Sequence, residues 1–373
     1  MKPFKPIIIC ALILVFFGCE VVPVEKKKPV IVHKVKEKPV LTPLDKVADT
    51  LNIAAVGDLM LGTSYPNEKN LPPDSAKWSF NAALNELKNA DVTFGNLEGT
   101  LINNAKPAPF KLKQVSKAWL FKMPPYYGNI FKDAGFKVVS LANNHIGDFG
   151  DTGRISTMKV LDSLGIYYGG QVKHPSALFK IKGLTIGFCA FAPNANTLPL
   201  LQLKNAANII YGLKKQCDVL IVSFHGGGEG PVFEHIPFKM ESYLNQKRGN
   251  VNAFAHIAID AGADLVFGNG PHVCRAMELY KNRLIAYSLG NFCTYRCVSV
   301  AGVCGIAPLL KVVVNKKGEF INGKIVSYKQ THNKGLLPDS LNKAAQKIKE
   351  LTESDFPDAG ILIAYNGQIS KKP

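Results

Sequence analysis

Short apolar runs alternate with helical patterns from residue 51 onward, and this alternation restricts the folds open to the chain. The apolar runs predict buried strands at 51–56, 92–94, 138–141, 184–191, 219–224 and 265–267. Helical spacing predicts helices at 76–87, 124–134, 152–164, 252–261 and 340–351, the last capped by Ser340. Such alternation is typical of an α/β fold. Two predicted hairpins, at 279–288 and 308–328, favour mixed sheets over purely parallel ones.

Polar side chains follow six predicted strands, at the point where each strand ends. They are Asp58; Asn96 and Glu98; Asn143, Asn144 and His145; His225 and Glu229; Asn269 and His272; and Asn291. Because the carboxyl ends of strands line the ligand crevice of an α/β sheet, we expect these side chains to meet. Carboxylates, amide oxygens and neutral imidazoles suit Mn, Fe or Zn. Taken alone, Asp58 is explained equally well as a helix N-cap, and His225 is better explained as a buried structural histidine.

The order of these segments resembles that of the capsule-synthesis CapA / poly-γ-glutamate synthesis family, a branch of the calcineurin-like metallophosphoesterases. The strings that carry the resemblance are AVGDLMLG at 55–62, GNLEG at 95–99, SLANNH at 140–145, AGADLV at 261–266 and YSLGNF at 287–292. The similar region covers about 51–330, and we assign 51–373 to one domain of this type. The resemblance implies a four-layer α/β/β/α sandwich with a metal cleft at one edge of its two sheets.

The resemblance also implies roles for individual residues. The implied metal ligands are Asp58, Glu98, Asn144, His225 and His272, holding one or two ions. Asp58 and His145 are the implied catalytic residues, His145 by stabilising a phosphoryl oxygen or protonating a leaving group. Candidate substrate-binding residues are Asn96, Asn143, Glu229, Asn269, Asn291 and Arg275. For Glu229 a surface position, and for Arg275 a structural salt bridge, are the alternatives.

Two positions depart from the superfamily pattern. Met60 stands where the superfamily has a histidine two residues after the first aspartate, and Gly270 stands where many relatives carry the first histidine of the last motif. The pattern therefore predicts one intact metal site and a weakened second one. The neighbouring Asn269 offers an amide oxygen as a substitute ligand.

The N-terminal residues 1–19 are predicted to be a lipoprotein signal peptide. Lys2 and Lys5 precede an apolar run at 7–17, and the run closes in Gly18-Cys19 like a bacterial lipobox. Cleavage before Cys19 and lipid attachment to its thiol are the implied events; a plain signal peptide or an uncleaved anchor is the alternative. Residues 20–50 repeat Val, Lys and Pro, which is typical of an extended tether.

Charge and cysteine usage narrow the partners. The chain carries 45 basic and 28 acidic residues, a net charge of +17 that indicates either a solvated basic surface or attraction to an anionic partner. Zinc-finger spacing, an RNP-like motif and a basic helix are absent, so we expect no nucleic-acid partner.

An envelope location permits a disulfide among Cys293, Cys297 and Cys304, with the pairing open, whereas Cys189 and Cys217 are predicted to be buried free thiols.

These patterns predict a lipid-anchored envelope protein of capsule or poly-γ-glutamate-type polymer synthesis, facing the periplasm or the exterior. Its expected partners are an anionic cell-surface polymer or its precursor, and membrane synthase subunits. The metal cluster favours a hydrolase or transferase. A non-catalytic polymer- or synthase-binding component with a degenerate metal site is the main alternative, and a soluble phosphatase is the third.

Overall fold

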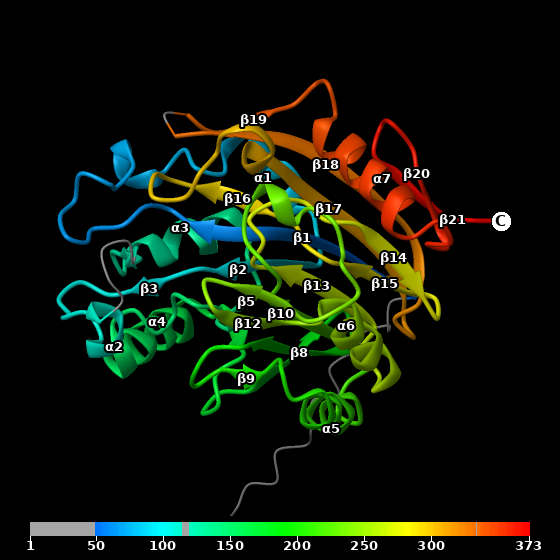
Figure 1. The fold of residues 1–373 in the computed structure, drawn as a ribbon, viewed down its shortest axis with the longest axis horizontal. Coiled ribbons are helices and arrows are strands. Elements are labelled where there is room, and N and C mark those ends of the chain that lie inside the picture. The colour runs from blue at the N-terminus through cyan, green and yellow to red at the C-terminus, as the bar shows by residue number, and fades with distance from the viewer. Residues whose placement is uncertain (1–48, 114–118, 333) are drawn as a thin grey trace, which may run out of the picture. The chain divides into compact units, whose positions relative to one another are not determined.

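Strand β1 (Thr50–Met60) lies inside the larger of two sheets in the computed structural model (Figure 1). The structure describes residues 49–113, 119–332 and 334–373. The predicted signal peptide, the predicted lipidation site Cys19 and nearly all of the predicted tether lie outside these residues. No helix in the described ranges is both long enough and apolar enough to cross a bilayer.

The first sheet is mixed. Its order is β20 (Ile361–Ile363), β21 (Gln368–Lys371), β18 (Phe320–Thr331), β17 (Ile306–Asn315), β1, β2 (Val92–Leu97), β5 (Val138–Ser140) and β6 (Tyr167–Gly169). Strands β1, β2, β5 and β6 run parallel, and β17 and β18 form an antiparallel hairpin. Two further strands join this sheet: β16 (Asn291–Thr294) pairs with β1, and β19 (Gly335–Pro338) with β18.

β1 changes partner at Gly57. Before this residue it pairs antiparallel with β17, and from Asp58 onward it pairs parallel with β16. A Cβ at Gly57 would lie 1.9 Å from the carbonyl oxygen of Gly290, so only glycine fits where the two backbones pass. The Asp58 N–H then donates to that same oxygen at 2.9 Å. The close approach fixes Asp58 at the end of the sheet.

The second sheet is parallel at its centre and antiparallel at both edges. Its order is β14 (Met277–Tyr280), β15 (Arg283–Ala286), β13 (Leu265–Asn269), β10 (Val219–His225), β8 (Leu184–Ala192) and β7 (Ser176–Ile181), with β9 (Leu198–Pro199) on β8. Two small sheets stand apart: β3 (Thr100–Leu101) with β4 (Lys122–Met123), and β11 (Glu241–Tyr243) with β12 (Gln246–Gly249).

The two sheets pack face to face around one apolar cluster, which both sheets supply. Phe94 of β2 stacks on Phe267 of β13 at 5.4 Å and lies 5.7 Å from Phe188 of β8. Helices α1 (Leu84–Lys88), α3 (Tyr127–Ala134) and α4 (Gly150–Leu164) cover the outer face of the first sheet. Helices α5 (Leu203–Lys214) and α6 (Val251–Asp260) cover the second, and Figure 1 shows them side by side. The predicted α/β/β/α layering with mixed sheets is thus confirmed.

Several element predictions are wrong in detail. The predicted helix at 76–87 is α-helical only from Leu84, because the backbone departs from ideal helical angles at Phe80 and Ala83. A short 3₁₀ turn, η2 (Asn81–Ala83), follows Phe80, and another, η1 (Pro73–Ala76), comes before it. Ser340 does not cap the last helix, α7 (Lys343–Asp355); the Asp339 carboxylate accepts the Lys343 N–H instead. The sequence patterns also did not predict α5, β6, β7 and β16.

All six cysteines of the described residues are free. Cys293 and Cys304 are buried, and Cys297 is half-buried. The suggested disulfide among these three is therefore not formed. Cys189 is a buried free thiol as predicted, and Cys217 is a free thiol that is only half-buried.

Candidate metal centre

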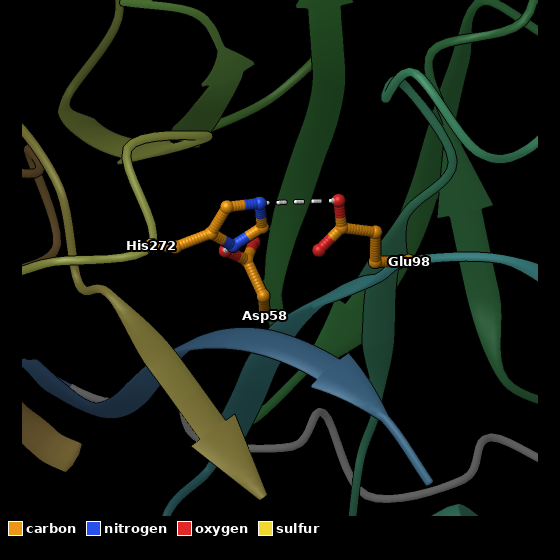
Figure 2. Close-up of side chains that lie close together, drawn as sticks. All are labelled: Asp58, Glu98 and His272. Carbon is orange, nitrogen blue, oxygen red and sulfur yellow. Dashed lines mark ion pairs between the residues drawn. The ribbon is translucent and has the colours of Figure 1, made fainter. Parts of the chain in front are cut away.

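Asp58, Glu98 and His272 bring one ligand atom each to within 4.8 Å of one another. Asp58 lies in β1, Glu98 directly follows β2, and His272 follows β13 of the other sheet. Figure 2 shows the imidazole of His272 facing the carboxylate of Glu98, with Asp58 beside the ring. His272 Nδ1 lies 2.9 Å from Asp58 Oδ2, and His272 Nε2 lies 3.7 Å from Glu98 Oε1. The centre thus joins the carboxyl ends of strands from both sheets.

Both carboxylates of this group are fully buried. Asp58 Oδ1 accepts a hydrogen bond from Asn96 Nδ2 at 2.7 Å. Neither oxygen of Glu98 has a hydrogen-bond partner among the described residues. Buried carboxylate oxygens are normally paired, because leaving them unpaired is costly. The orphaned oxygens therefore fit a bound cation.

Burial raises the pKa of Glu98 to about 8; the charge of His272 opposes this rise, and that of Asp58 adds to it. Burial would lower the pKa of His272, but the charges of Glu98 and Asp58 outweigh it and hold this pKa well above 6.5. The His272 ring lies between the two carboxyl groups, at 2.9 Å from Asp58 and 3.7 Å from Glu98, in a place that favours positive charge.

His225, at the end of β10, lies outside the 4.8 Å group but close to it. The centroids of the His225 and His272 rings are 6.4 Å apart. His225 Nδ1 is 3.3 Å from Asn96 Nδ2, and its Nε2 is buried without a partner among the described residues. Burial, with the nearby Arg248 charge, holds the pKa of His225 well below 6.5. A neutral imidazole is the form that binds metals, through the ring nitrogen that carries no proton.

Two amide oxygens near the site also lack a hydrogen-bond partner. Oδ1 of Asn144 and Oδ1 of Asn269 are both buried without a hydrogen-bond partner in the part of the chain that the structure describes. Asn269 Nδ2 is fixed by Ser223 Oγ at 3.3 Å. Carboxylate, imidazole and amide donors together form a set suited to Mn, Fe or Zn. The residues present thus fit a divalent metal.

His145 contacts a buried ion pair of Asp148 and Lys111 that the sequence patterns did not predict. Its Nδ1 lies 2.8 Å from Asp148 Oδ2, and Lys111 Nζ lies 2.8 Å from Asp148 Oδ1. The ring of Phe121 stacks on the imidazole at 3.9 Å. Burial lowers the pKa of His145, although Asp148 opposes this. The three-residue spacing of His145 and Asp148 was the available signal; nothing local pointed to Lys111.

Asn143 and Asn291 orient groups of the site. Asn143 Nδ2 donates to Asn96 Oδ1 at 3.2 Å, and its Oδ1 accepts the backbone N–H groups of His145 and Ile146. Asn291 Oδ1 lies 3.0 Å from His272 Nδ1. Each amide therefore fixes a neighbouring site residue, whatever else it contacts in a complex.

The remaining candidates lie in ion pairs around the loop after β10. Glu229 pairs with Arg248 at 2.7 Å, and its charge also raises the pKa of Glu98. Arg275 is fully buried and makes two bonds to Glu241, at 2.9 and 2.7 Å. Its Nε donates to the carbonyl of Phe233. Arg275 therefore makes the buried structural salt bridge that the sequence left open as the alternative to substrate binding.

The two departures from the superfamily pattern have structural reasons. Met60 is fully buried in a small apolar cluster with Phe121 and Val298. Gly270 has a φ of +116°, and a Cβ there would lie 2.8 Å from the Gly226 carbonyl oxygen. The backbone at this position excludes a histidine, because only glycine adopts this conformation without strain. These two positions therefore supply no imidazole to a second metal site.

The sequence profile of one family, "Bacterial capsule synthesis protein PGA_cap", matches residues 52–296, more than half of the chain. The chain belongs to this family. The match takes in the strands that carry Asp58, Glu98, His145, His225 and His272 and ends before β17, so the C-terminal hairpin beside β1 lies outside it. The expected resemblance to capsule-synthesis proteins is confirmed.

Two curated relatives carry related names. The chain is similar to "Capsule biosynthesis protein CapA" of Bacillus anthracis, with 28% identity over 65% of this chain and 60% of the relative. It is also similar to "PGA biosynthesis protein CapA" of Bacillus subtilis, with 29% identity over 65% of this chain and 63% of the relative. The match spans about three fifths of the length of these relatives.

Among solved structures, the chain is similar to the 5'-nucleotidase precursor of Thermus thermophilus. It shares 13% identity and a TM-score of 0.42, over 74% of this chain and 54% of that one.

Proposed function

We propose that this PGA_cap family member serves in the synthesis of a capsule or poly-γ-glutamate-type polymer, with a metal-dependent hydrolase or transferase site. The observation that carries the proposal is the buried group of Asp58, Glu98 and His272 with its unpaired carboxylate oxygens. The names of the two CapA relatives, which refer to capsule and PGA biosynthesis, support the polymer class.

The proposed ligands are Asp58, Glu98, His225, His272 and Asn144, with Asn269 as a further oxygen donor. One or two divalent ions, of Mn, Fe or Zn, bound there would supply Lewis-acid activation of water and of a phosphoryl or acyl oxygen. Asn96 orients Asp58 and His225 together, because its Nδ2 contacts both. Asn291 contacts His272, and Asn143 accepts the backbone N–H of His145. Both amides therefore fix these histidines relative to the proposed ligands.

His145 is the proposed acid or oxygen-stabilising group. With its Nδ1 proton donated to Asp148, His145 directs Nε2 to substrate, and it donates from Nε2 in its imidazolium form, which the charge of Asp148 favours. Lys111 neutralises Asp148, and the stacked Phe121 ring limits rotation of the imidazole. Asp148 and Lys111 therefore act as positioning residues for this histidine.

The proposed setting is the cell envelope. Residues 1–19 act as the lipoprotein signal, Cys19 carries the lipid, 20–50 form the tether, and 51–373 form the domain. The net charge of +17 supports an anionic cell-surface polymer or its precursor as substrate, and membrane synthase subunits as partners.

Metal content tests the proposal directly. The full chain is purified without chelators, and its Mn, Fe and Zn are measured by elemental analysis beside the His225→Ala/His272→Ala variant. We expect about one or two equivalents in the wild type and a clear loss in the variant. Wild-type protein that is folded, free of these metals and unable to take them up would contradict the metal site.

A non-catalytic polymer- or synthase-binding component is the second candidate. The burial of Met60 and the backbone conformation of Gly270 favour this candidate, since neither position supplies a ligand for a second ion. Replacing His145 separates the two candidates. An enzyme loses turnover of phosphoester or polyglutamate substrates in His145→Ala, whereas a binding component keeps its polymer affinity.

A further inference from the structure

Two arginines contact the turn that follows β10. This turn, 226–229, comes directly after His225, and its arginine contacts are Arg248 in β12 and Arg275. The Gly227 N–H donates to the Arg248 carbonyl at 2.9 Å, and a Cβ on Gly227 would lie 2.8 Å from Arg275 Nη1. Figure 1 shows β12 beside β10. Both arginines are therefore built against the backbone that carries a candidate metal ligand.

The two guanidinium groups differ in how many of their donors are used. All three nitrogens of Arg275 are paired within the protein, two of them with Glu241. Arg248 donates from Nε to the Gly227 carbonyl at 3.2 Å and from Nη2 to Glu229 Oε1 at 2.7 Å. Its Nη1 forms no hydrogen bond with any residue of the described ranges. A guanidinium carries more N–H groups than these two bonds use, so Arg248 keeps donors for a further acceptor.

The pair of Arg248 and Glu229 is nearly buried. Only 3% of the Arg248 side chain and 17% of the Glu229 side chain are exposed. A charged group at this depth is costly unless its donors are paired. The planar donors of a guanidinium match the oxygens of a carboxylate or a phosphate. The unused donors of Arg248 therefore indicate an oxyanion as ligand.

The pair lies within electrostatic reach of both the metal centre and His145. Burial holds the pKa of His225 well below 6.5, and the charge of Arg248 is the next cause. Burial also raises the pKa of Glu98; the charge of Glu229 adds to this rise, and that of Arg248 opposes it. Burial lowers the pKa of His145, and Glu229 opposes this change too. An oxyanion on Arg248 would therefore lie beside the residues that the proposed reaction uses.

The charges at the centre favour a substrate that is itself anionic. Asp58, Glu98 and Glu229 bring three carboxyl groups to this part of the protein. A divalent ion would offset the first two, and Arg248 offsets the third through their ion pair. Like charges at a binding site repel a ligand, so an anionic group needs a donor of its own there. A neutral substrate would leave the remaining donors of Arg248 unpaired.

We propose that Arg248 binds an oxyanion of the substrate, a carboxylate or a phosphate, next to the group that reacts, while Glu229 holds the guanidinium in place. This inference rests on the proposed function, because it adds the charge of the substrate to the same site. It makes Arg248 a specificity-determining residue. A γ-linked glutamate polymer carries a carboxylate beside each amide bond, and a phosphoester carries the phosphate itself, so both substrate classes present the required group.

Ligand binding without turnover tests this assignment. The full chain is titrated in a calorimeter with a γ-linked glutamate oligomer, with the same oligomer after amidation of its carboxylates, and with inorganic phosphate. We expect Arg248→Gln to weaken binding of the charged oligomer or of phosphate by about tenfold or more, as loss of a hydrogen bond to a charged group does. Its affinity for the amidated oligomer should equal that of the wild type. A loss with the oligomer assigns a carboxylate, and a loss with phosphate alone assigns a phosphate.

Three further variants control for charge and for folding. Arg248→Lys keeps the charge but not the planar donors, so it should recover only part of the affinity. Arg248→Gln/Glu229→Gln leaves no unpaired carboxylate and should show the same loss, which keeps the test open where the single variant folds poorly. Arg283→Gln removes one positive charge before β13, at the end of the strand opposite His272, where Lys214 still pairs with Asp264. This last variant should bind both anions like the wild type.

Metal content, measured on the same preparations, separates this proposal from the metal site. Wild-type protein that holds no metal, but whose anion affinity falls in Arg248→Gln, contradicts the metal site and supports the oxyanion site. Anion affinity that is absent in the wild type, or unchanged in Arg248→Gln, would overturn the oxyanion site. An equal loss in Arg248→Gln and Arg283→Gln would also overturn it, because net charge alone then explains the binding. An equal loss with charged and amidated oligomers would do the same.

Discussion

His272 Nδ1 lies 2.9 Å from Oδ2 of Asp58, and this contact joins the two sheets at the candidate metal centre. Asp58 is fixed by the partner change of β1 at Gly57, and His272 by Asn291 of β16, the strand that β1 then takes as partner. The same strands therefore build the metal centre and the point where β1 changes partner. A substitution that disturbs one of them should also disturb the other.

Asp58→Asn should lower the metal content of the full chain. The substitution keeps the shape of the side chain and its bond to Asn96 but removes the charge that would bind a cation. We expect at least the roughly tenfold loss of affinity that even outer contacts of metal sites cause. Elemental analysis after equilibration with limiting Zn or Mn measures it. Asp260→Asn, in an exposed pair with Lys281, is the control and should retain metal; an equal loss in both would argue against the assignment.

Asp148→Asn and His145→Gln should reduce turnover without releasing metal. Asp148→Asn removes the charge 2.8 Å from His145 Nδ1, and His145→Gln removes the imidazole itself. Loss of a positioned acid typically costs roughly 10²-fold or more in rate. Rates with a phosphoester series and metal content are measured on the same preparations. Metal lost in step with rate would make His145 a ligand instead of an acid.

Gly270→His should destabilise the protein and should not create a second metal site. A side chain there has positive φ and a Cβ 2.8 Å from the Gly226 carbonyl oxygen, so we expect about 3 kcal/mol or more of lost stability. Gly302→Ala is the control, because Gly302 also has positive φ but has open space around it. Its cost should be about 1 kcal/mol. Thermal unfolding measures both, and an unchanged melting temperature with an added metal equivalent would refute this interpretation.

Arg275→Met should cost about 3–5 kcal/mol of stability, because it leaves Glu241 buried without its charge partner. Adding Glu241→Gln should recover part of this loss, since the amide is neutral and still accepts the Gly228 N–H. Urea unfolding of the two single variants and the double variant gives the coupling energy. A double variant no more stable than Arg275→Met alone would show that the pair is not what the arginine supports.

The sequence predicted the centre better than it predicted the elements around it. Polar residues at strand ends were enough to bring Asp58, Glu98 and His272 together, because parallel strands deliver their carboxyl ends to the same edge. Long apolar strands such as β8 and β10 were located correctly for a related reason: burial on both faces leaves continuous apolar runs.

The features that the sequence patterns did not predict depend on tertiary contacts. The apolar spacing at 76–87 reflects Phe80, Ala83 and Leu87, which are buried in a segment of short turns, so burial imitated a helix. Lys111 reaches Asp148 across 37 positions of sequence, and no local pattern marks such a contact. Arg275 was ambiguous for the same reason, since Glu241 lies in a hairpin far along the chain.

His272 stands more than a hundred and seventy residues along the chain from both Asp58 and Glu98, so the three donors meet only in the folded protein. A cation held by all three would therefore stabilise the packing of the two sheets against each other. At a free concentration about one hundred times its Kd, such a ligand adds about 2.7 kcal/mol to the free energy of unfolding. The concentration of free metal around the protein would then set what fraction of it stays folded, as well as what it does.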